Sequence, residues 1–144
     1  MISMKKIMKR FLSVFFAGVF CVLFCSCEKG TENEKSADTK TLTYEQITPQ
    51  EAKRIMDSTE EYILLDTRTD EEYAQGHIEG AILIPEYEIA SRAEQELPDK
   101  DALILVYCRS GRRSKIASEE LVKLGYTNVK EFGGIIDWPY EIVR

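Results

Sequence analysis

The sequence predicts an α/β domain built on a mainly parallel β-sheet with helices covering both faces. Short apolar runs alternate with segments of helical periodicity from about residue 42 to the end of the chain, which is typical of parallel sheets. The apolar runs are nearly continuous, as expected of strands that are buried on both faces. The chain has 144 residues, of which 44% are hydrophobic, enough for a single core. We find no internal repeat.

Each expected element is bounded by a local signal. Pro49 lies in the first turn of a helix, Pro85 and Pro98 end a strand and a helix, and Gly125 follows a helix end. The expected strands span residues 42–47, 62–65, 81–84, 102–107 and 129–132. The expected helices span residues 49–56, 69–73, 86–96, 114–124 and 135–142.

The N-terminus has the layout of a secretory signal. Four basic residues lie within residues 5–10, and an uncharged stretch rich in Phe, Val and Leu follows over residues 11–27. Its apolar part, residues 11–25, is 15 residues long, whereas a spanning helix needs roughly 20. We therefore expect a signal peptide and an exported protein. A short cytoplasmic protein with an apolar N-terminus is the weaker alternative.

The end of this stretch resembles a bacterial lipoprotein signal. Ser26 precedes Cys27, and the resemblance implies that Cys27 is lipidated and anchors the protein to a membrane of the cell envelope. The alternative is an ordinary secretory signal and a periplasmic protein, with Cys27 incidental. Residues 28–41 contain no large apolar side chain and are expected to form a disordered charged tether. The domains are therefore a lipoprotein-type signal at 1–27, a tether at 28–41 and a folded domain at 42–144.

The charge distribution excludes one class of partner. Residues 28–144 carry 15 basic and 25 acidic side chains, a net charge of −10. Nucleic-acid-binding proteins need a basic surface, so we expect no nucleic acid partner.

Cys108 is the candidate nucleophile. Cys21 and Cys25 lie in the expected signal peptide and Cys27 would carry lipid, which leaves Cys108 as a lone free thiol with no disulfide partner. It ends the apolar run 102–107 and opens the sequence CRSGRRS. A thiol between a buried strand and a helix start lies where backbone N–H groups converge, and these favour an anion or a thiolate.

The arginines that follow Cys108 support this interpretation. Arg109, Arg112 and Arg113 form a local positive patch in an acidic domain, which can focus small anions into a cleft. Arginine is disfavoured near a helix N-terminus by the helix dipole, so a merely solvated helix start does not explain three of them. A buried structural cysteine would also leave them unexplained. We predict a reactive sulfur nucleophile that faces an anionic substrate.

The region from about Tyr44 to the end resembles a single rhodanese domain. Three blocks in the same order carry the resemblance: residues 65–68 with 72–73, 76–78, 80–81 and 84–85; the CRSGRRS segment after Val106 and Tyr107; and residues 133–135 with Trp138. It implies a rhodanese-like fold with a five-stranded parallel sheet. It also implies an active-site loop after the fourth strand and sulfur transfer through a cysteine persulfide. Pro139 directly after Trp138 departs from the pattern and leaves the packing of the last turn open.

The resemblance assigns roles within the loop. Cys108 is the expected catalytic residue, and Gly111 lets the loop curl. Ser114 either caps the following helix or donates a hydrogen bond to the sulfur, with capping favoured. The expected substrate-binding residues are Arg109, Ser110, Gly111, Arg112, Arg113 and Ser114, of which at least one arginine points to solvent.

The expected reaction moves a sulfane sulfur from a small anionic donor such as thiosulfate to a thiol or to cyanide. We expect a monomer that needs no metal and no cofactor. Cysteine-based phosphatases place an arginine six positions after the nucleophile, where this chain has Ser114, so phosphatase activity is disfavoured. The alternative from another class is a rhodanese-fold binding or sulfur-carrier module without turnover.

Four further residues invite a role, and we predict a structural one for each. His77 is the lone histidine and is expected to fix a loop by hydrogen bonds. Asp66 and Arg68 are expected to pair at the end of a strand. Trp138 is expected to pack in the core against the final helix.

Overall fold

The computed structural model describes residues 43–59 and 61–144. The predicted signal peptide at 1–27, with Cys27, and the predicted tether at 28–41 lie outside these residues. Five strands form one sheet in the order β1-β5-β4-β2-β3, and every pair is parallel. The strands are β1 Glu45–Gln46, β2 Ile63–Asp66, β3 Ile82–Leu83, β4 Ile104–Cys108 and β5 Val129–Gly134. The predicted five-stranded parallel α/β fold is confirmed.

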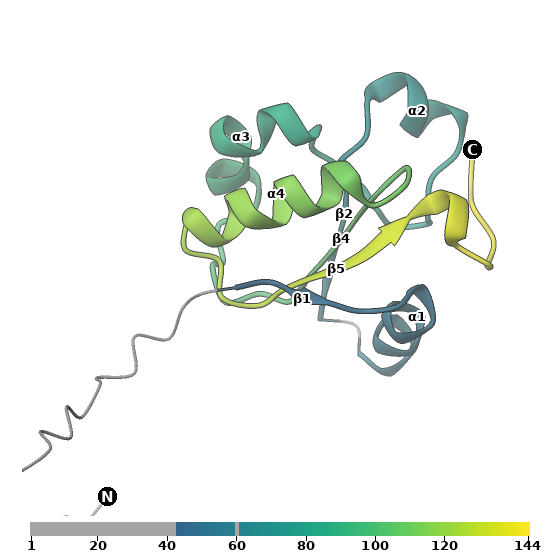
Figure 1. Ribbon diagram of the computed structural model, residues 1–144, viewed down its shortest axis with the longest axis horizontal. Helices are drawn as coiled ribbons and strands as arrows, with labels where there is room; N and C mark the ends of the chain where they lie inside the picture. The colour runs from purple at the N-terminus through teal and green to yellow at the C-terminus, as the bar shows by residue number, and fades with distance from the viewer. Residues whose placement is uncertain (1–42, 60) are drawn as a thin grey trace, which may run out of the picture. The chain divides into compact units, whose positions relative to one another are not determined.

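Helices cover both faces of this sheet, as Figure 1 shows. Helix α1 packs on one face, and α3 and α4 pack on the other. The helices are α1 Pro49–Ser58, α2 Asp70–Gln75, α3 Ile89–Glu96 and α4 Arg112–Lys123, with 3₁₀ turns η1 Glu86–Glu88 and η2 Ile135–Asp137. No helix of the described part of the chain is both long and apolar enough to cross a membrane.

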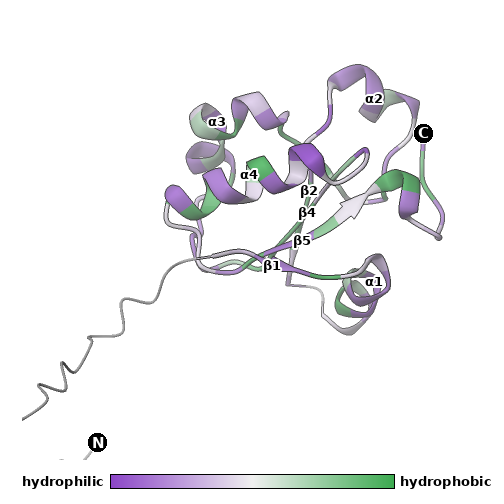
Figure 2. Cartoon of the chain, viewed as in Figure 1, coloured by the Kyte–Doolittle hydropathy of each residue, from purple (hydrophilic) through white to green (hydrophobic). Residues whose placement is uncertain are grey.

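The alternation of side chains along β4 divides the core into two clusters. Ile104 and Val106 face α3 and α4, whereas Leu105 and Tyr107 belong to the cluster on the α1 side. Figure 2 shows hydrophobic residues, in green, on the central strands and many hydrophilic residues, in purple, on the helices around them. By the same alternation, Cys108 lies on the side of α4.

The register brings three strand ends to one place. Asp66 of β2 lies beside Tyr107 of β4, and Cys108 lies beside Gly134 of β5, after an irregularity in the β4–β5 ladder. In open parallel sheets, the carboxyl ends of the strands are the usual place for a binding site. The fold therefore positions Cys108 where the sequence predicts it.

The predicted helix at 135–142 is wrong. The structure forms only the 3₁₀ turn η2, and Trp138 is extended with φ −78° and ψ 110°. Pro139 explains the difference, because the residue before a proline is driven out of the helical region. The chain instead runs back past α2, where Val143 pairs with His77 in an antiparallel bridge.

Candidate active site

Cys108 is the last residue of β4, and only 1% of its surface is exposed. A short loop over residues 109–111 connects it to α4, which begins at Arg112. The backbone N–H of Gly111 donates a hydrogen bond to Cys108 Sγ at 3.1 Å. The loop thus curls around the sulfur and presents main-chain donors to it.

These donors determine the acidity of the thiol. Burial raises the pKa of Cys108, because a thiolate loses solvation. Hydrogen bonds from the Ser114 side chain and from the N–H groups of Ser114, Ser110 and Gly111 lower it by more, so the pKa of Cys108 lies below its ordinary value. This matches the cradle expected at the start of α4. No arginine is among the leading causes of the lowered pKa.

Two glycines give the loop its shape. Gly111 has φ +91°, in the left-handed region that glycine adopts without strain. Gly134 has an ordinary backbone, but a Cβ built on it would lie 2.1 Å from the Arg109 carbonyl oxygen. That carbonyl also accepts a hydrogen bond from the N–H of Ile136 in η2. The loop is therefore packed directly against the end of β5.

The loop side chains divide into two groups. Arg109, Ser110 and Arg112 are exposed to solvent, so two guanidinium groups are free to meet an anion. Arg113 is partly buried and donates to both carboxylate oxygens of Glu72 in α2, at 2.6 and 2.9 Å. The expectation that at least one arginine points to solvent is confirmed.

The expectation that Ser114 caps α4 is wrong. Gly111 occupies the N-cap position and makes no side-chain cap. Ser114 is fully buried, and its hydroxyl contacts the Glu131 carboxyl group at 2.6 Å. The sequence gives no direct sign of this contact, because the two residues are 17 positions apart.

Buried polar contacts also fix the end of β2 beside the loop. Arg68 forms a buried ion pair with Asp66, at 2.6 Å, and donates to the Gly76 carbonyl at 2.8 Å. Thr67 donates its hydroxyl to the Tyr107 carbonyl at 2.9 Å. The predicted Asp66–Arg68 pair is confirmed.

His77 has the structural role that the sequence predicts, whereas for Trp138 the predicted core position is confirmed and the predicted contact with a final helix is wrong. The His77 ring stacks on Tyr73 with 3.8 Å between ring centroids, and its Nδ1 lies 3.2 Å from the Tyr73 carbonyl. Trp138 is buried in the α1-side cluster against Phe132. It packs there without the final helix.

Comparison with known proteins places the chain in a family. A family model described as a rhodanese-like domain matches residues 48–139. The chain belongs to the rhodanese-like domain family. The rhodanese domain is 44% identical over 73 residues to the thiosulfate sulfurtransferase PspE of Escherichia coli, covering 51% of this chain and 70% of that protein. It is 41% identical over 88 residues to a sulfurtransferase of Allochromatium vinosum, covering 60% and 79%.

A solved structure supports the same assignment. A structure described as a rhodanese with anions from E. coli is 40% identical, with a TM-score of 0.55, and the match covers 58% of this chain and 98% of that one. The rhodanese fold and the sulfurtransferase family are therefore established for this domain.

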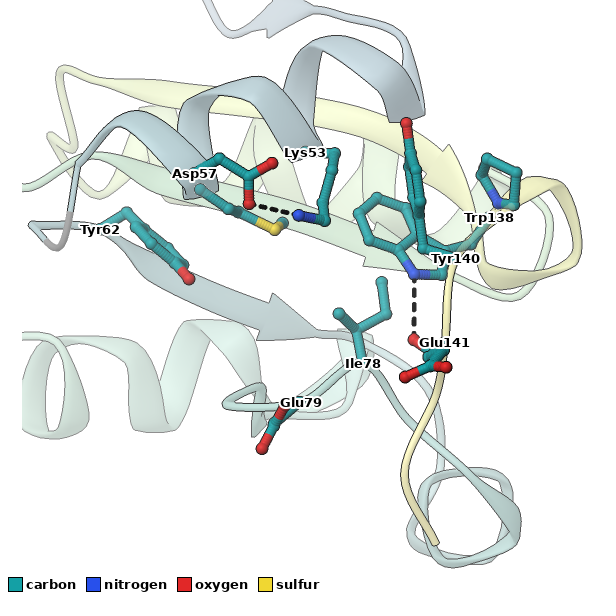
Figure 3. Close-up of a pocket in the computed structure, with 10 residues that line it drawn as sticks. Lys53, Asp57, Tyr62, Ile78, Glu79, Trp138, Tyr140 and Glu141 are labelled. Atoms are coloured by element: carbon teal, nitrogen blue, oxygen red, sulfur yellow. Dashed lines mark hydrogen bonds and ion pairs between the residues drawn. The ribbon is translucent and has the colours of Figure 1, made fainter.

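Two cavities of the rhodanese domain differ in their chemistry. A cleft of about 760 Å³ lies against α1 and the segment after η2. Figure 3 shows it lined by Tyr62 and Tyr140, with Lys53 paired to Asp57. Its lining residues include no cysteine and no histidine. A smaller cavity of about 210 Å³ adjoins the Cys108 loop and includes Arg109 and Ile136. The smaller cavity is the candidate active site, because Arg109, the first residue of the Cys108 loop, lines it.

Sequence reasoning missed two acidic residues of this site. Glu72, which lies in α2, accepts hydrogen bonds from Arg113, and Glu131, which lies in β5, accepts one from Ser114. The sequence does contain one signal for Glu131. It lies two positions after Val129 in the same strand, so both side chains point to the same face of the sheet, the face that packs on α4. No local pattern links Glu72 to Arg113, which lie 41 residues apart.

Proposed function

We propose that the domain transfers a sulfane sulfur from a small anionic donor such as thiosulfate to a thiol or to cyanide through a persulfide on Cys108. The observation that carries the proposal is the cradle of N–H groups around Cys108, with Gly111 N at 3.1 Å from the sulfur. The named sulfurtransferases among its relatives support the same class of reaction.

The first step forms the persulfide. The Cys108 thiolate attacks the outer sulfur of thiosulfate, the S–S bond of the donor breaks, and sulfite leaves with the bonding electron pair. The exposed Arg109 and Arg112 side chains attract the dianionic donor. The main-chain N–H groups of the loop hold the negative charge that then lies on the outer sulfur.

The second step regenerates the enzyme. An acceptor thiolate or cyanide attacks the outer sulfur of the persulfide, forming an acceptor persulfide or thiocyanate. The S–S bond to Cys108 breaks, and Cys108 leaves as a thiolate. The low pKa of Cys108 favours this departure. The two steps balance without an external oxidant or reductant, and no general acid is required.

The test is thiocyanate formation from thiosulfate and cyanide by the purified full-length chain. Cys108→Ser keeps the size of the side chain but cannot form a persulfide, so we expect turnover to fall to the uncatalysed rate. Cys25→Ser in the same unprocessed chain is the control, because Cys25 lies outside the rhodanese domain, and it should retain turnover. A wild-type chain without thiocyanate formation would favour the alternative of a binding or carrier module.

We further propose that the protein is exported, acts as a monomer and is held at the cell envelope by lipid on Cys27. The order of basic residues, apolar stretch, Ser26 and Cys27 supports the anchor. The acidic balance of residues 28–144 supports the absence of a nucleic acid partner.

A further inference from the structure

One side of the cavity beside the Cys108 loop is apolar. Ile135 and Ile136 of η2 line it together with Ile142 of the C-terminal segment. Ile136 is 62% exposed and Ile142 is 40% exposed, although burial of an isoleucine side chain is favourable. Ligand-binding sites are typically lined by apolar side chains with a few polar groups. The three isoleucines form an apolar wall that is open to a ligand.

The apolar wall begins next to the residue pair that contains the nucleophile. Cys108 at the end of β4 lies beside Gly134 of β5. The residue that follows each of them, Arg109 and Ile135, lines the cavity. The backbone N–H of Ile136 donates to the Arg109 carbonyl at 3.2 Å, which fixes η2 against the loop. The cavity is therefore reached one residue beyond Cys108 on one strand and one residue beyond Gly134 on the other.

The far part of the apolar wall is held in place by the segment after Pro139. The chain runs back past α2 there (Figure 1), and His77 and Val143 exchange two backbone hydrogen bonds, at 2.9 and 2.8 Å. A Cβ built on Gly76 would lie 3.0 Å from Ile142 Cδ1, so this side chain packs directly on the Gly76 backbone. The wall is therefore formed before any ligand arrives.

The charged residues of the cavity are compensated, with one exception. Arg68 pairs with Asp66, and Glu72 pairs with Arg113. Arg109 is exposed and takes part in no ion pair between described residues. Its guanidinium suits an anionic sulfur donor, but thiosulfate and cyanide have no apolar part that would contact the isoleucines. The apolar wall is therefore left for a different acceptor.

We propose that Ile136 and Ile142 are specificity-determining residues, which select as the sulfur acceptor a small thiol with an apolar body. This inference rests on the proposed function of Cys108. The acceptor thiolate attacks the outer sulfur of the Cys108 persulfide and becomes a persulfide itself. The S–S bond to Cys108 breaks, and Cys108 leaves as a thiolate. The cavity of about 210 Å³ suits a single ring or a short alkyl chain.

The apolar wall acts on the rate of this second step. Contact between the apolar body and the isoleucines is made in the transition state as well as in the complex, so it raises the second-order rate constant for the acceptor. Cyanide and hydrophilic thiols make no such contact. Loss of one isoleucine should therefore slow an apolar thiol and leave the other acceptors unaffected.

The test measures the second step alone, in the full-length chain. Thiosulfate forms the Cys108 persulfide, desalting removes the donor, and phenylmethanethiol, 2-mercaptoethanol or cyanide is then added. Trapping with iodoacetamide and the mass of the Cys108 peptide follow the loss of the added sulfur. Each variant is compared with the wild type for the same acceptor, so the intrinsic reactivity of each acceptor cancels.

Ile136→Ser and Ile142→Ser should each lower the rate constant for phenylmethanethiol about three- to tenfold. The constants for 2-mercaptoethanol and cyanide should stay within about twofold of the wild type. Ile136→Leu keeps an apolar side chain at the wall and should retain the wild-type constant for phenylmethanethiol. Ile116→Ser is the matched control, because Ile116 of α4 is 41% exposed and does not line the cavity. It should leave all three constants unchanged.

Two results would overturn the inference. One is a wild-type constant for phenylmethanethiol in both serine variants. The other is an equal loss for all three acceptors, which would show a general effect on the loop and no selection of the acceptor. In both cases the persulfide forms and the proposed function stands. A folded chain that gains no sulfur from thiosulfate would instead refute the proposed function, and this inference with it.

Discussion

The Arg113 guanidinium binds both carboxylate oxygens of Glu72, at 2.6 and 2.9 Å, and so joins the first turn of α4 to α2. Glu72 also accepts a hydrogen bond from the N–H of Thr69 in the capping box of α2. The Glu72 carboxylate therefore completes the N-terminal capping box of α2 and also holds Arg113 at the start of α4, the helix that follows the Cys108 loop. Both side chains are 21% exposed, so solvent screens the pair only in part.

Glu72→Gln should destabilise the domain by about 1 kcal/mol, because the bidentate pair is lost while the amide can still close the helix start. Denaturant unfolding at neutral pH measures this change. Glu119→Gln, an exposed glutamate of α4, is the control and should be neutral. Equal stability of Glu72→Gln and the wild type would contradict a stabilising pair.

The same pair predicts an acid-dependent loss of stability. The hydrogen bond from Arg113 lowers the pKa of Glu72 from 4.5 to about 2. A carboxyl group with a lowered pKa stabilises the fold fully above its unfolded value and loses that contribution as the pH falls. The difference in unfolding free energy between wild type and Glu72→Gln should therefore shrink between about pH 4.5 and pH 2. A difference that stays constant over this range would contradict the assignment.

Gly134→Ala should damage the loop more than the fold. The new Cβ would lie 2.1 Å from the Arg109 carbonyl oxygen and 2.5 Å from Ser110 Cα. Overpacking of this kind costs about 1–3 kcal/mol, and the displaced loop should slow sulfur transfer on the order of 100-fold. Thiocyanate formation and thermal unfolding measure the two effects.

Gly125→Ala is the matched control for this substitution. Gly125 has φ +93°, but a Cβ there would meet no atom within 4 Å. It should cost about 1–2 kcal/mol of backbone strain and leave transfer unchanged. Wild-type transfer by Gly134→Ala would refute the close packing of the loop against β5.

Asp66→Asn should be strongly destabilising, by about 3–5 kcal/mol, because the buried Arg68 guanidinium would lose its charged partner. Asp57→Asn removes an exposed carboxylate that pairs with Lys53 on α1 and should cost less than about 1 kcal/mol. Urea denaturation compares the two variants. Similar losses for both would rule out a special role for the buried pair.

Cys27→Ala tests the proposed anchor. If lipid on Cys27 holds the protein at the envelope, the variant should lose its partition into the detergent phase, or it should accumulate unprocessed. In the wild type, the proposed anchor implies cleavage between Ser26 and Cys27, so that Ser26 is the last residue removed with the signal. Partition equal to that of the wild type would exclude Cys27 as the anchor.

The sequence predicted the order of the strands and helices well, for a physical reason. Strands buried on both faces must be continuously apolar, and Pro49, Pro85 and Gly125 mark the boundaries of elements directly. The segment after η2 was predicted incorrectly, because the apolar pattern was given more weight than the restriction that Pro139 imposes on Trp138.

The candidate site was predictable only where it is local. Cys108 and its cradle lie on one continuous segment, so a strand, a glycine and a helix start indicate them together. Ser114 depends on Glu131, and Arg113 depends on Glu72, which the fold brings from other elements. Such partners follow from the packing of the sheet and not from local sequence.

The most direct measurement of the central claim is the intact mass of the full-length chain before and after thiosulfate, with the modified residue located by fragmentation. We predict one added sulfur atom on Cys108, removed again by cyanide, and no such addition in Cys108→Ser. An unmodified Cys108 in a folded chain at saturating thiosulfate, or sulfur added only to Cys21, Cys25 or Cys27, would contradict the account.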